Sequence, residues 1–518
     1  MANKSVFASI KGRLLPFADT TNKEKAPAYR YSDAHALAQV AMTGTFGATY
    51  YQDPTQELSR TLDLAQKVDP SFLAQAAAYT RKNGHMKDMP ALLLAVLSGR
   101  DPILFQSAFG RVVDNGKMLR TFVQIMRSGQ TGRKSLGSAP KRMVANWLND
   151  ASDRALLQAN VGKDPSLADV IKMVHPKPQS KAREAFFAWI IGKPCDVALL
   201  PQPVQDFLRF KENGKGHVPD VPFQMLTQLP LSKKQWAKIA KNASWQMTRM
   251  NLNTFLRHGV LDMKNMRRHV ADVLRDPDRI AKARVFPYQL MTAYQALSPE
   301  MPAEIRDALH DAMELSVANV PKLRGQVVVC PDVSGSMSGA VTGFRKGATT
   351  VTRFVDVAGL VSAAILRRNP SATVLPFEVK VRDVRMEPRD TILTNAARLA
   401  DQWGGGTNCA APLDWLLAKG RAPDLVIMVS DNQSWAHAAY GNNGTAMMQS
   451  WEKLKRRNPK AKLVCIDIAP YGRTQAKERD DVLNIGGFSD TVFDQIASFA
   501  AGEMGADHWV GQIKAVEI

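Results

Sequence analysis

The sequence has few cysteines and no long apolar run, and both shortages narrow the kinds of protein it can be. Its 518 residues contain 4 cysteines, scattered at positions 195, 330, 409 and 465 without a C-x-x-C pair. Such thiols are typical of a reducing compartment and give no zinc-binding framework. The longest apolar runs, such as LLLAV at residues 92–96, are too short to cross a bilayer, and the first residues lack the apolar stretch of a secretory signal. We therefore expect a cytoplasmic protein without a membrane segment.

The charge of the chain is unevenly distributed. The composition, 45% hydrophobic and 22% charged, is that of a globular protein, and the formal net charge is +20. Residues 1–324 contain 46 Lys and Arg against 28 Asp and Glu, whereas residues 325–518 contain 22 against 20. An excess of cations in one part of a chain indicates a partner with many negative charges, such as a nucleic acid. A generally basic surface with no such partner is the alternative.

The periodicity of apolar residues divides the chain in two. Up to about residue 321 they recur at three and four, and segments such as PSFLAQAAAYTRKNG (residues 70–84) end at Gly, Pro, Asn or Asp. This pattern predicts a helical domain over residues 1–324, arranged as an α-solenoid of HEAT-like repeats. A compact irregular helical domain is the alternative, because no residue-level repeat is visible.

From residue 325 to 518 short apolar runs rich in Val and Ile alternate with helical stretches. VVVCPD, ATVLPFEVKV, DLVIMVSD and KLVCIDIAP are the expected strands. Strands alternating with helices predict a doubly wound, Rossmann-like parallel sheet covered on both faces. Ligands of such sheets bind beyond the carboxyl ends of the strands.

Three polar segments follow expected strands or precede helices in this second domain. They are DVSGS, GGGTN and SDNQS, which contain Asp332, Ser334, Ser336, Thr407 and Asp431. Together they resemble the metal-ion-dependent adhesion site of von Willebrand A domains. Two carboxylates and three hydroxyls are oxygen donors of the kind that Mg²⁺ prefers, and they leave the ion electrophilic enough to accept a further carboxylate. A capping turn without metal is the alternative.

The resemblance to A domains implies a role for each of these residues. Ser334, Ser336 and Thr407 would coordinate Mg²⁺ or another divalent cation directly, and Asp332 and Asp431 would hold it through bound water. Asn408 stands where a carboxylate is frequent in such domains, and Asn432 where Gly is frequent. No histidine and no second acidic cluster accompany the motif, so we expect no catalysis there.

Basic segments of the first domain are candidate phosphate-binding sites. In SGQTGRKSLGSAPKRMVANWLND (residues 128–150) four cations surround the start of an expected helix, where free N–H groups also favour anions. A solvated basic loop is the alternative. Further clusters occupy residues 164–193, 249–259, 266–269 and 282–290, the last with aromatic residues among its cations, a mixture that suits single-stranded RNA. The candidate RNA-binding residues are Arg133, Lys134, Lys141, Arg142, Lys172, His175, Lys177, Lys181, Asn253, Arg257, His258 and Arg284.

The motifs GRKSLGSAPKRMVANWL and DVIKMVHPKP, joined in one chain to CPDVSGSM and SDNQSW, resemble the Ro autoantigen (TROVE) family. The resemblance implies helical repeats closed into a ring with a basic central hole. Single-stranded 3′ ends of misfolded RNA would enter the hole, and small structured Y RNAs would bind the outer surface. Bacterial members tether the ring through a Y RNA to polynucleotide phosphorylase, a ribonuclease.

The resemblance also assigns roles to the basic residues. Lys172 and His175 match the outer helix that binds Y RNA, and the four cations at residues 133–142 match the basic loop and helix. Asn253, Arg257 and His258 match residues that line the central hole in that family.

Together with this resemblance, the sequence predicts a monomeric, non-enzymatic RNA-binding scaffold, and the resemblance implies that it acts in RNA quality control and decay. A Mg²⁺-dependent adaptor whose solenoid binds acidic proteins is the alternative from another class. A partner's acidic residue would then be the ligand of the metal site. A hydrolase that uses the metal site is the third hypothesis for the function.

Overall fold

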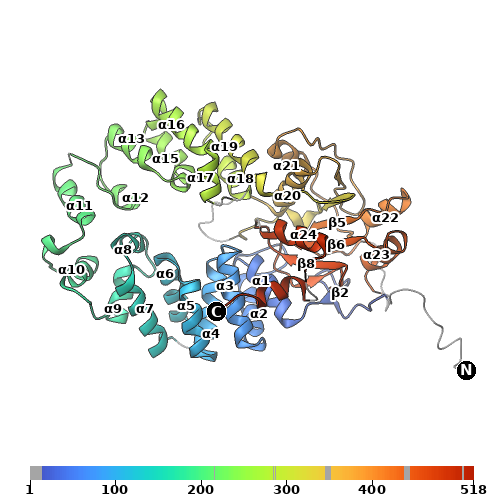
Figure 1. Ribbon diagram of the computed structural model, residues 1–518, viewed down its shortest axis with the longest axis horizontal. Helices are drawn as coiled ribbons and strands as arrows, with labels where there is room; N and C mark the ends of the chain where they lie inside the picture. The colour runs from blue at the N-terminus through green and yellow to red at the C-terminus, as the bar shows by residue number, and fades with distance from the viewer. Residues whose placement is uncertain are drawn as a thin grey trace, which may run out of the picture. The chain divides into compact units, whose positions relative to one another are not determined.

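The computed structural model describes residues 15–132, 134–214, 216–283, 285, 287–344, 352–436, 444–489, 491–504 and 507–518. By their contacts these residues form two compact units, each made from several stretches of chain (Figure 1). The sheet-containing unit takes the described residues of Met1–Thr61, Phe286–Gln295 and Ser316–Gln512. The helical unit takes those of Leu62–Val285, Ala296–Leu315 and Ile513–Ile518. The predicted boundary at residue 324 follows the order of helices and strands along the chain, whereas the compact units are interleaved.

The helical unit is built from short helices joined by short turns. Its helices are α3 (Pro70–Lys82), α4 (Asp88–Arg100), α5 (Pro102–Val112), α6 (Gly116–Arg127), α7 (Ser138–Asp150), α8 (Asp153–Ala159), α9 (Leu167–Val174), α10 (Lys181–Ile190), α11 (Gln202–Asn213), α12 (Phe223–Leu226), α13 (Lys233–Asn242), α14 (Trp245–Met250), α15 (Leu252–Arg257), α16 (Lys264–Arg275), α17 (Pro277–Ala283) and most of α19 (Ala303–Ser316). Two single 3₁₀ turns, Val197–Leu199 and Val260–Asp262, lie between them.

Side chains at helix starts explain many of these boundaries. Asp69, Asp101 and Asn115 each accept a hydrogen bond from a backbone N–H in the first turn of the helix that follows. This satisfies N–H groups that the helix itself leaves unpaired. Helices then pack on close neighbours in sequence: α4 contacts α3, α5 and α6, and α7 contacts α5 and α9. In stacked helical hairpins each helix packs mainly on its neighbours in sequence, as seen here. The predicted helical repeats are therefore confirmed.

The second unit is organised around a five-stranded parallel sheet. Its strands are β3 (Val327–Pro331), β4 (Thr373–Val374), β5 (Leu425–Ser430), β6 (Lys462–Asp467) and β8 (Val482–Gly486), in the order β4-β3-β5-β6-β8. β3, the first strand of this sheet in sequence, is thus internal. β4 lies on one side of it, and β5, β6 and β8 follow in order on the other side. The doubly wound sheet predicted from the sequence is confirmed. The direction of winding changes between β3 and β5, and a ligand-binding crevice forms at such a point.

Helices cover both faces of this sheet. On one face Val328, Cys330, Val426 and Met428 pack in a single buried core against α22 (Ala411–Ala418) and α23 (Ala446–Arg457). α20 (Phe354–Arg368) contacts β3, and α1 (Asp33–Thr43) contacts β8. The remaining helices of the unit are α2 (Pro54–Lys67, shared with the helical unit), α18 (Pro287–Gln295), α21 (Ile392–Ala400), α24 (Thr491–Ala501) and α25 (His508–Lys514, also shared), with 3₁₀ turns at Val317–Asn319 and Gly335–Ser338. All four cysteines are free, and Cys330 and Cys409 are buried in that core.

A second, smaller sheet was not predicted. β1 (Thr20–Thr21) pairs antiparallel with β2 (Pro27–Arg30), and β2 pairs antiparallel with β7 (Arg473–Thr474). Residues 20–30 lie within the helical domain predicted over residues 1–324, but these pairings group them with the sheet-containing unit. Strands of two to four residues give too little alternation to be recognised. Among the described residues no helix is long and apolar enough to cross a membrane.

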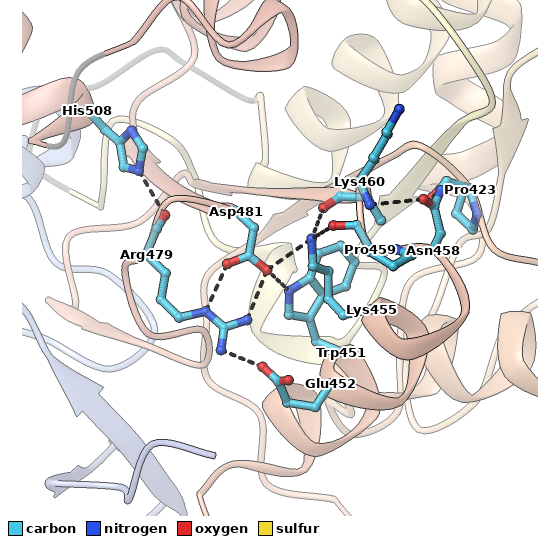
Figure 2. A network of polar contacts seen from close by, with 11 residues as sticks. Pro423, Trp451, Glu452, Lys455, Asn458, Pro459, Lys460, Arg479, Asp481 and His508 are labelled. Carbon is cyan, nitrogen blue, oxygen red and sulfur yellow. Dashed lines mark hydrogen bonds and ion pairs between the residues drawn. The ribbon is translucent and has the colours of Figure 1, made fainter. Parts of the chain in front are cut away.

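A polar network holds α23 against the start of β8 (Figure 2). Both oxygens of Asp481 accept hydrogen bonds from Arg479, at 2.9 Å to Nε and 3.0 Å to Nη2. The indole N–H of Trp451 donates to Asp481 at 3.0 Å, and Glu452 pairs with Arg479. Burial would raise the pKa of Asp481, but the hydrogen bonds from Arg479 outweigh it and lower the pKa. The network therefore stabilises the folded state whenever Asp481 is ionised.

Asp481→Asn should destabilise the protein because it removes the anion that pairs with a largely buried arginine. We expect the free energy of unfolding in urea at pH 7 to fall by about 3 kcal/mol. Since the pKa is lowered in the folded state, the wild type should lose this contribution as pH falls below the ordinary pKa of 3.8. The variant should lack that step in its stability–pH profile.

Glu387→Gln is the matched control, because its ion pair with Arg385 lies on the surface. Such pairs contribute about 0–1 kcal/mol. Equal losses in the two variants would contradict a structural role for the network.

Candidate metal site and basic surfaces

The first loop of the candidate metal site follows β3 directly. Oδ1 of Asp332 accepts a hydrogen bond from the backbone N–H of Ser334 at 2.8 Å, and Oδ2 accepts one from the hydroxyl of Ser430 at 2.6 Å. The hydroxyls of Ser334 and Ser336 lie 3.4 Å apart. Asp332, Ser334 and Ser336 are all buried. The loop is therefore a fixed concave arrangement of oxygen atoms.

The second loop brings Thr407 to the same edge of the sheet. The backbone N–H of Gly335 donates to the carbonyl of Gly405 at 3.1 Å, so the first two loops are joined directly. Gly405 has φ of +76°, and a Cβ there would lie 2.5 Å from a carboxylate oxygen of Glu378. Only glycine fits that position without displacement. Thr407 is buried beside this turn.

The third loop supplies Asp431, which follows β5. β5 is the neighbour of β3 in the sheet, and the N–H of Asp332 donates to the carbonyl of Val429 at 2.9 Å. Oδ1 of Asp431 accepts a hydrogen bond from the N–H of Gln433 at 3.1 Å. Its Oδ2 is buried and has no partner in hydrogen-bonding geometry among the residues that the structure describes. A buried carboxylate oxygen without a partner is costly, and a bound cation would satisfy it.

The electrostatics of the site favour a cation. Burial raises the pKa of Asp332 to about 6. Burial and then the charge of Asp332 raise the pKa of Asp431 to about 7, although the hydroxyl of Ser336 lowers it. Two carboxylates in one buried site cannot both ionise without cost unless a positive charge lies between them. In the described part of the chain no three His, Cys, Asp or Glu side chains converge as metal ligands, so hydroxyls would have to complete the site.

The structure therefore brings together all five residues predicted for the metal site. It adds Ser430 and Gln433, which hold the two carboxylates through hydrogen bonds. Their roles could not be assigned from the sequence, because a polar residue beside a strand end is common.

The candidate RNA-binding residues at residues 133–142 surround the start of α7. Lys134, Lys141 and Arg142 are exposed, and Arg133 lies outside the described residues. α7 begins at Ser138. Its N-cap, Gly137, provides no side-chain hydrogen bond. Backbone N–H groups in the first turn thus stay available for an anion beside three cations.

The candidates at residues 172–181 form a second exposed group. Lys172 lies in the last turn of α9, His175 caps that helix, and Lys181 begins α10. The side chain of Asn149, near the end of α7, donates to the carbonyl of Lys177 at 3.0 Å. The group thus lies by the far end of α7, and a helix of 13 residues separates it by about 20 Å from the basic start of α7. Several phosphates of one RNA span such a distance.

The candidates at residues 253–258 have other contacts. The side-chain amide of Asn253 donates to the carbonyl of Ala296 at 2.7 Å and accepts from the N–H of Ser298 at 3.0 Å. The ring of His258 stacks on Trp236, with ring centroids 4.0 Å apart. Arg257 is exposed, and Arg284 lies outside the described residues. Asn253 thus has a structural role that its sequence context did not reveal.

A pocket in the helical unit was not predicted. It has a volume of about 820 Å³ and lies between α8, the segment before α12, α13 and α14. Arg154, His217 and Lys238 line it together with Phe223 and Met250. These residues come from distant segments without a shared motif, so the sequence carried no signal for them.

The architecture defines the class of protein as a helical-repeat unit combined with an A domain of the von Willebrand type. Residues 326–500 match the family model described as the Ro60 vWA domain. "RNA-binding protein RO60" of Deinococcus radiodurans is 25% identical over 522 residues, which cover 92% of this chain and 94% of that protein. A Caenorhabditis elegans protein of the same name is 23% identical over 295 residues, 53% of this chain and 43% of that protein.

A solved structure shows the same fold. The crystal structure of the Deinococcus radiodurans RO (RSR) protein has a TM-score of 0.59 and 21% identity, and the match covers 91% of this chain and all of that one. The predicted resemblance to the Ro family is thereby confirmed. The relatives are named for binding RNA and not for a reaction, in agreement with the expectation of a protein that is not an enzyme.

Asp431→Asn should stabilise the protein when divalent metal is removed. Because the pKa of Asp431 is raised in the folded state, the wild type loses stability as pH rises from its ordinary 3.8 to about 7. At pH 8 in EDTA we expect the free energy of unfolding of the variant to exceed that of the wild type by about 2 kcal/mol. Addition of Mg²⁺ should reverse the order, because the variant loses an anionic partner of the cation. A variant less stable than the wild type in EDTA would contradict the repulsion inferred here.

Proposed function

We propose that this chain is an RNA-binding protein whose helical unit holds RNA through phosphate contacts. The observation that carries the proposal is the start of α7, where Lys134, Lys141 and Arg142 lie exposed around an uncapped helix end. The +18 excess of residues 1–324 supports it, because contacts to phosphates supply affinity without sequence preference. The names of the relatives support it as well.

The bound RNAs in this proposal are of two kinds. Small structured Y RNA binds the outer group at Lys172 and His175, and single-stranded 3′ ends of misfolded RNA enter a ring closed by the helical repeats. The protein acts as a monomer in the cytoplasm, in RNA quality control and decay. A Y RNA tethers it to an exoribonuclease, polynucleotide phosphorylase.

The A domain in this proposal holds Mg²⁺ or another divalent cation. Ser334, Ser336 and Thr407 would bind the ion directly, and Asp332 and Asp431 would hold it through water. The unpartnered Oδ2 of Asp431 supports this assignment. The ion would supply positive charge that allows both buried carboxylates to ionise and one further oxygen ligand to bind.

A second function is favoured by two exposed tryptophans beside this site. Trp403 precedes the glycines of the second loop and is 47% exposed, and Trp435 follows the third loop and is 42% exposed. Exposed tryptophans are frequent anchors of protein interfaces. We propose that the A domain also makes metal-dependent contacts with an acidic protein partner.

Neutralising the cations around α7 tests the RNA proposal. The variant Arg133→Gln, Lys134→Gln, Lys141→Gln and Arg142→Gln should bind a hairpin RNA with a single-stranded 3′ tail more weakly. The slope of log affinity against log salt concentration should become less negative by about 3, because each lost phosphate contact reduces the size of that slope by about 0.7 to 0.9. Fluorescence anisotropy at four salt concentrations measures both quantities.

The control variant removes the same charge from exposed cations of the A domain: Lys419, Lys453, Arg456 and Lys460, each changed to Gln. It should retain the affinity and the salt dependence of the wild type. Equal loss in both variants would mean that net charge alone, and not the start of α7, governs binding.

A further inference from the structure

Exposed cations gather at the edge of the parallel sheet that lies opposite the candidate metal site. The metal-site loops follow the carboxyl ends of β3 and β5, whereas residues 321–326, 418–424 and 456–461 lead into the amino ends of β3, β5 and β6. The first residues of these three strands are register partners, so the three segments before them lie side by side. Their exposed cations, here called the amino-end surface, are Lys322, Arg324, Lys419, Arg421, Arg456, Arg457 and Lys460.

Hydrogen bonds join the three segments to one another. The backbone N–H of Gln326 donates to Oδ2 of Asp424 at 2.8 Å, and the N–H of Asp424 donates to the carbonyl of Gln326 at 2.9 Å. The side-chain amide of Asn458 donates to the carbonyl of Pro423 and to Oδ1 of Asp424, both at 3.1 Å (Figure 2). A Cβ at Gly325 would collide with the carboxylate of Asp424, so this close approach requires glycine. The cations are thus carried by one fixed arrangement of turns.

Negative charge is scarce on the amino-end surface. Asp424 is the one Asp or Glu in the three segments, and its two carboxylate oxygens accept hydrogen bonds from Gln326 and Asn458. Among the residues that the structure describes, none of the seven cations forms an ion pair. Five of the 22 Lys and Arg of residues 325–518 belong to this surface, and the other 17 are outnumbered by 20 Asp and Glu. The surface is therefore a local concentration of positive charge in a part of the chain that is otherwise slightly acidic.

The ends of helices explain only part of this cluster. Lys419 caps the end of α22, and the cations that α23 contributes lie in its last turn, where the helix dipole stabilises positive charge. Lys322, Arg324 and Arg421 lie outside any helix and gain no such stabilisation. A partner with several negative charges would account for these cations.

We propose that the amino-end surface binds an acidic segment of a partner protein, without metal and apart from the bound RNA. Three neighbouring strands span about 10 Å, so a few extended residues are long enough to reach all three segments. Arginines pair with carboxylates through two parallel N–H groups, and the turns that carry them are already fixed by hydrogen bonds. Little entropy is therefore lost from the surface when the acidic segment binds. This contact differs from the one proposed at the metal site, because no ion takes part and the two lie at opposite edges of the sheet.

Two observations favour an acidic peptide over RNA at this surface. A long RNA that reached it would also run over the acidic remainder of residues 325–518, whereas a short acidic segment covers the cations alone. Single-stranded RNA stacks its bases on open aromatic side chains. Trp415, by contrast, is half-buried, with Cζ of Arg421 5.6 Å and Nζ of Lys419 6.0 Å from the centre of its ring. The ring thus supports the cations and presents no open platform for a base.

Fluorescence anisotropy of a labelled decaglutamate peptide, titrated with the full-length chain in EDTA, tests the proposal. A hairpin RNA at saturating concentration keeps the cations of the helical unit occupied. The variant Lys322→Gln, Arg324→Gln and Arg421→Gln should bind the peptide about tenfold more weakly, because three exposed ion pairs of modest strength are lost. Its thermal unfolding should match that of the wild type, since these side chains are exposed.

The matched control removes the same charge from Lys25, Arg30 and Lys380, each changed to Gln. These cations are exposed, and they lie in segments that contact the loops of the metal site, at the other edge of the sheet. The control should bind the peptide as the wild type does. Equal weakening in both variants would mean that net charge alone attracts the peptide, and it would overturn the proposal, as would unchanged binding in the first variant.

Two further outcomes would also overturn it. Peptide binding that appears only after Mg²⁺ is added would place the acidic segment at the metal site. A labelled decauridylate that binds in place of the peptide, and loses affinity in the first variant but not in the control, would make the amino-end surface a second RNA-binding site.

Discussion

Two buried carboxylates at the switch point of the parallel sheet impose the main constraint on this protein. Asp332 and Asp431 follow β3 and β5, adjacent strands whose carboxyl ends meet at one edge. The sheet leaves each side chain no route to water, and burial raises the pKa of both. Hydroxyls, backbone N–H groups and the glycine turn at Gly405 then collect around them. The proposed divalent cation would offset the repulsion between these carboxylates, and the hydrogen-bonded loops would keep its ligands in place.

The sheet-containing unit extends beyond the A domain in sequence because the N-terminal strands are part of its structure. β2 pairs with β7, and Asn22 and Lys23 bond to residues more than 400 positions away. These contacts cluster around the third loop of the metal site. The N-terminal segment therefore supports the loop after Asp431 through the hydrogen bonds of Asn22 and Lys23.

The helical unit achieves its proposed function by different means. Its core is apolar and its helices contact near neighbours, so exposed positions are free to carry cations. Placing cations at the uncapped start of α7 adds their charge to that of the helix end, which concentrates positive potential at one point. A second basic group lies about one helix length away by the end of α9. Such spacing suits a polymer with regular charges better than a small anion.

A feature of the fold or of the candidate site was predictable where the sequence pattern that specifies it lies within a few neighbouring residues. The sequence by itself determined the helices, the doubly wound sheet and the grouping of five candidate metal ligands at one edge of that sheet, because apolar periodicity and strand-end motifs are encoded within a few residues. Only the tertiary structure decided that Asn253 is tied to Ala296 and Ser298, that α7 lacks a side-chain cap, and that residues 22–24 meet the loop after Asp431. Those outcomes depend on which distant segments pack together, and no short-range pattern records that choice.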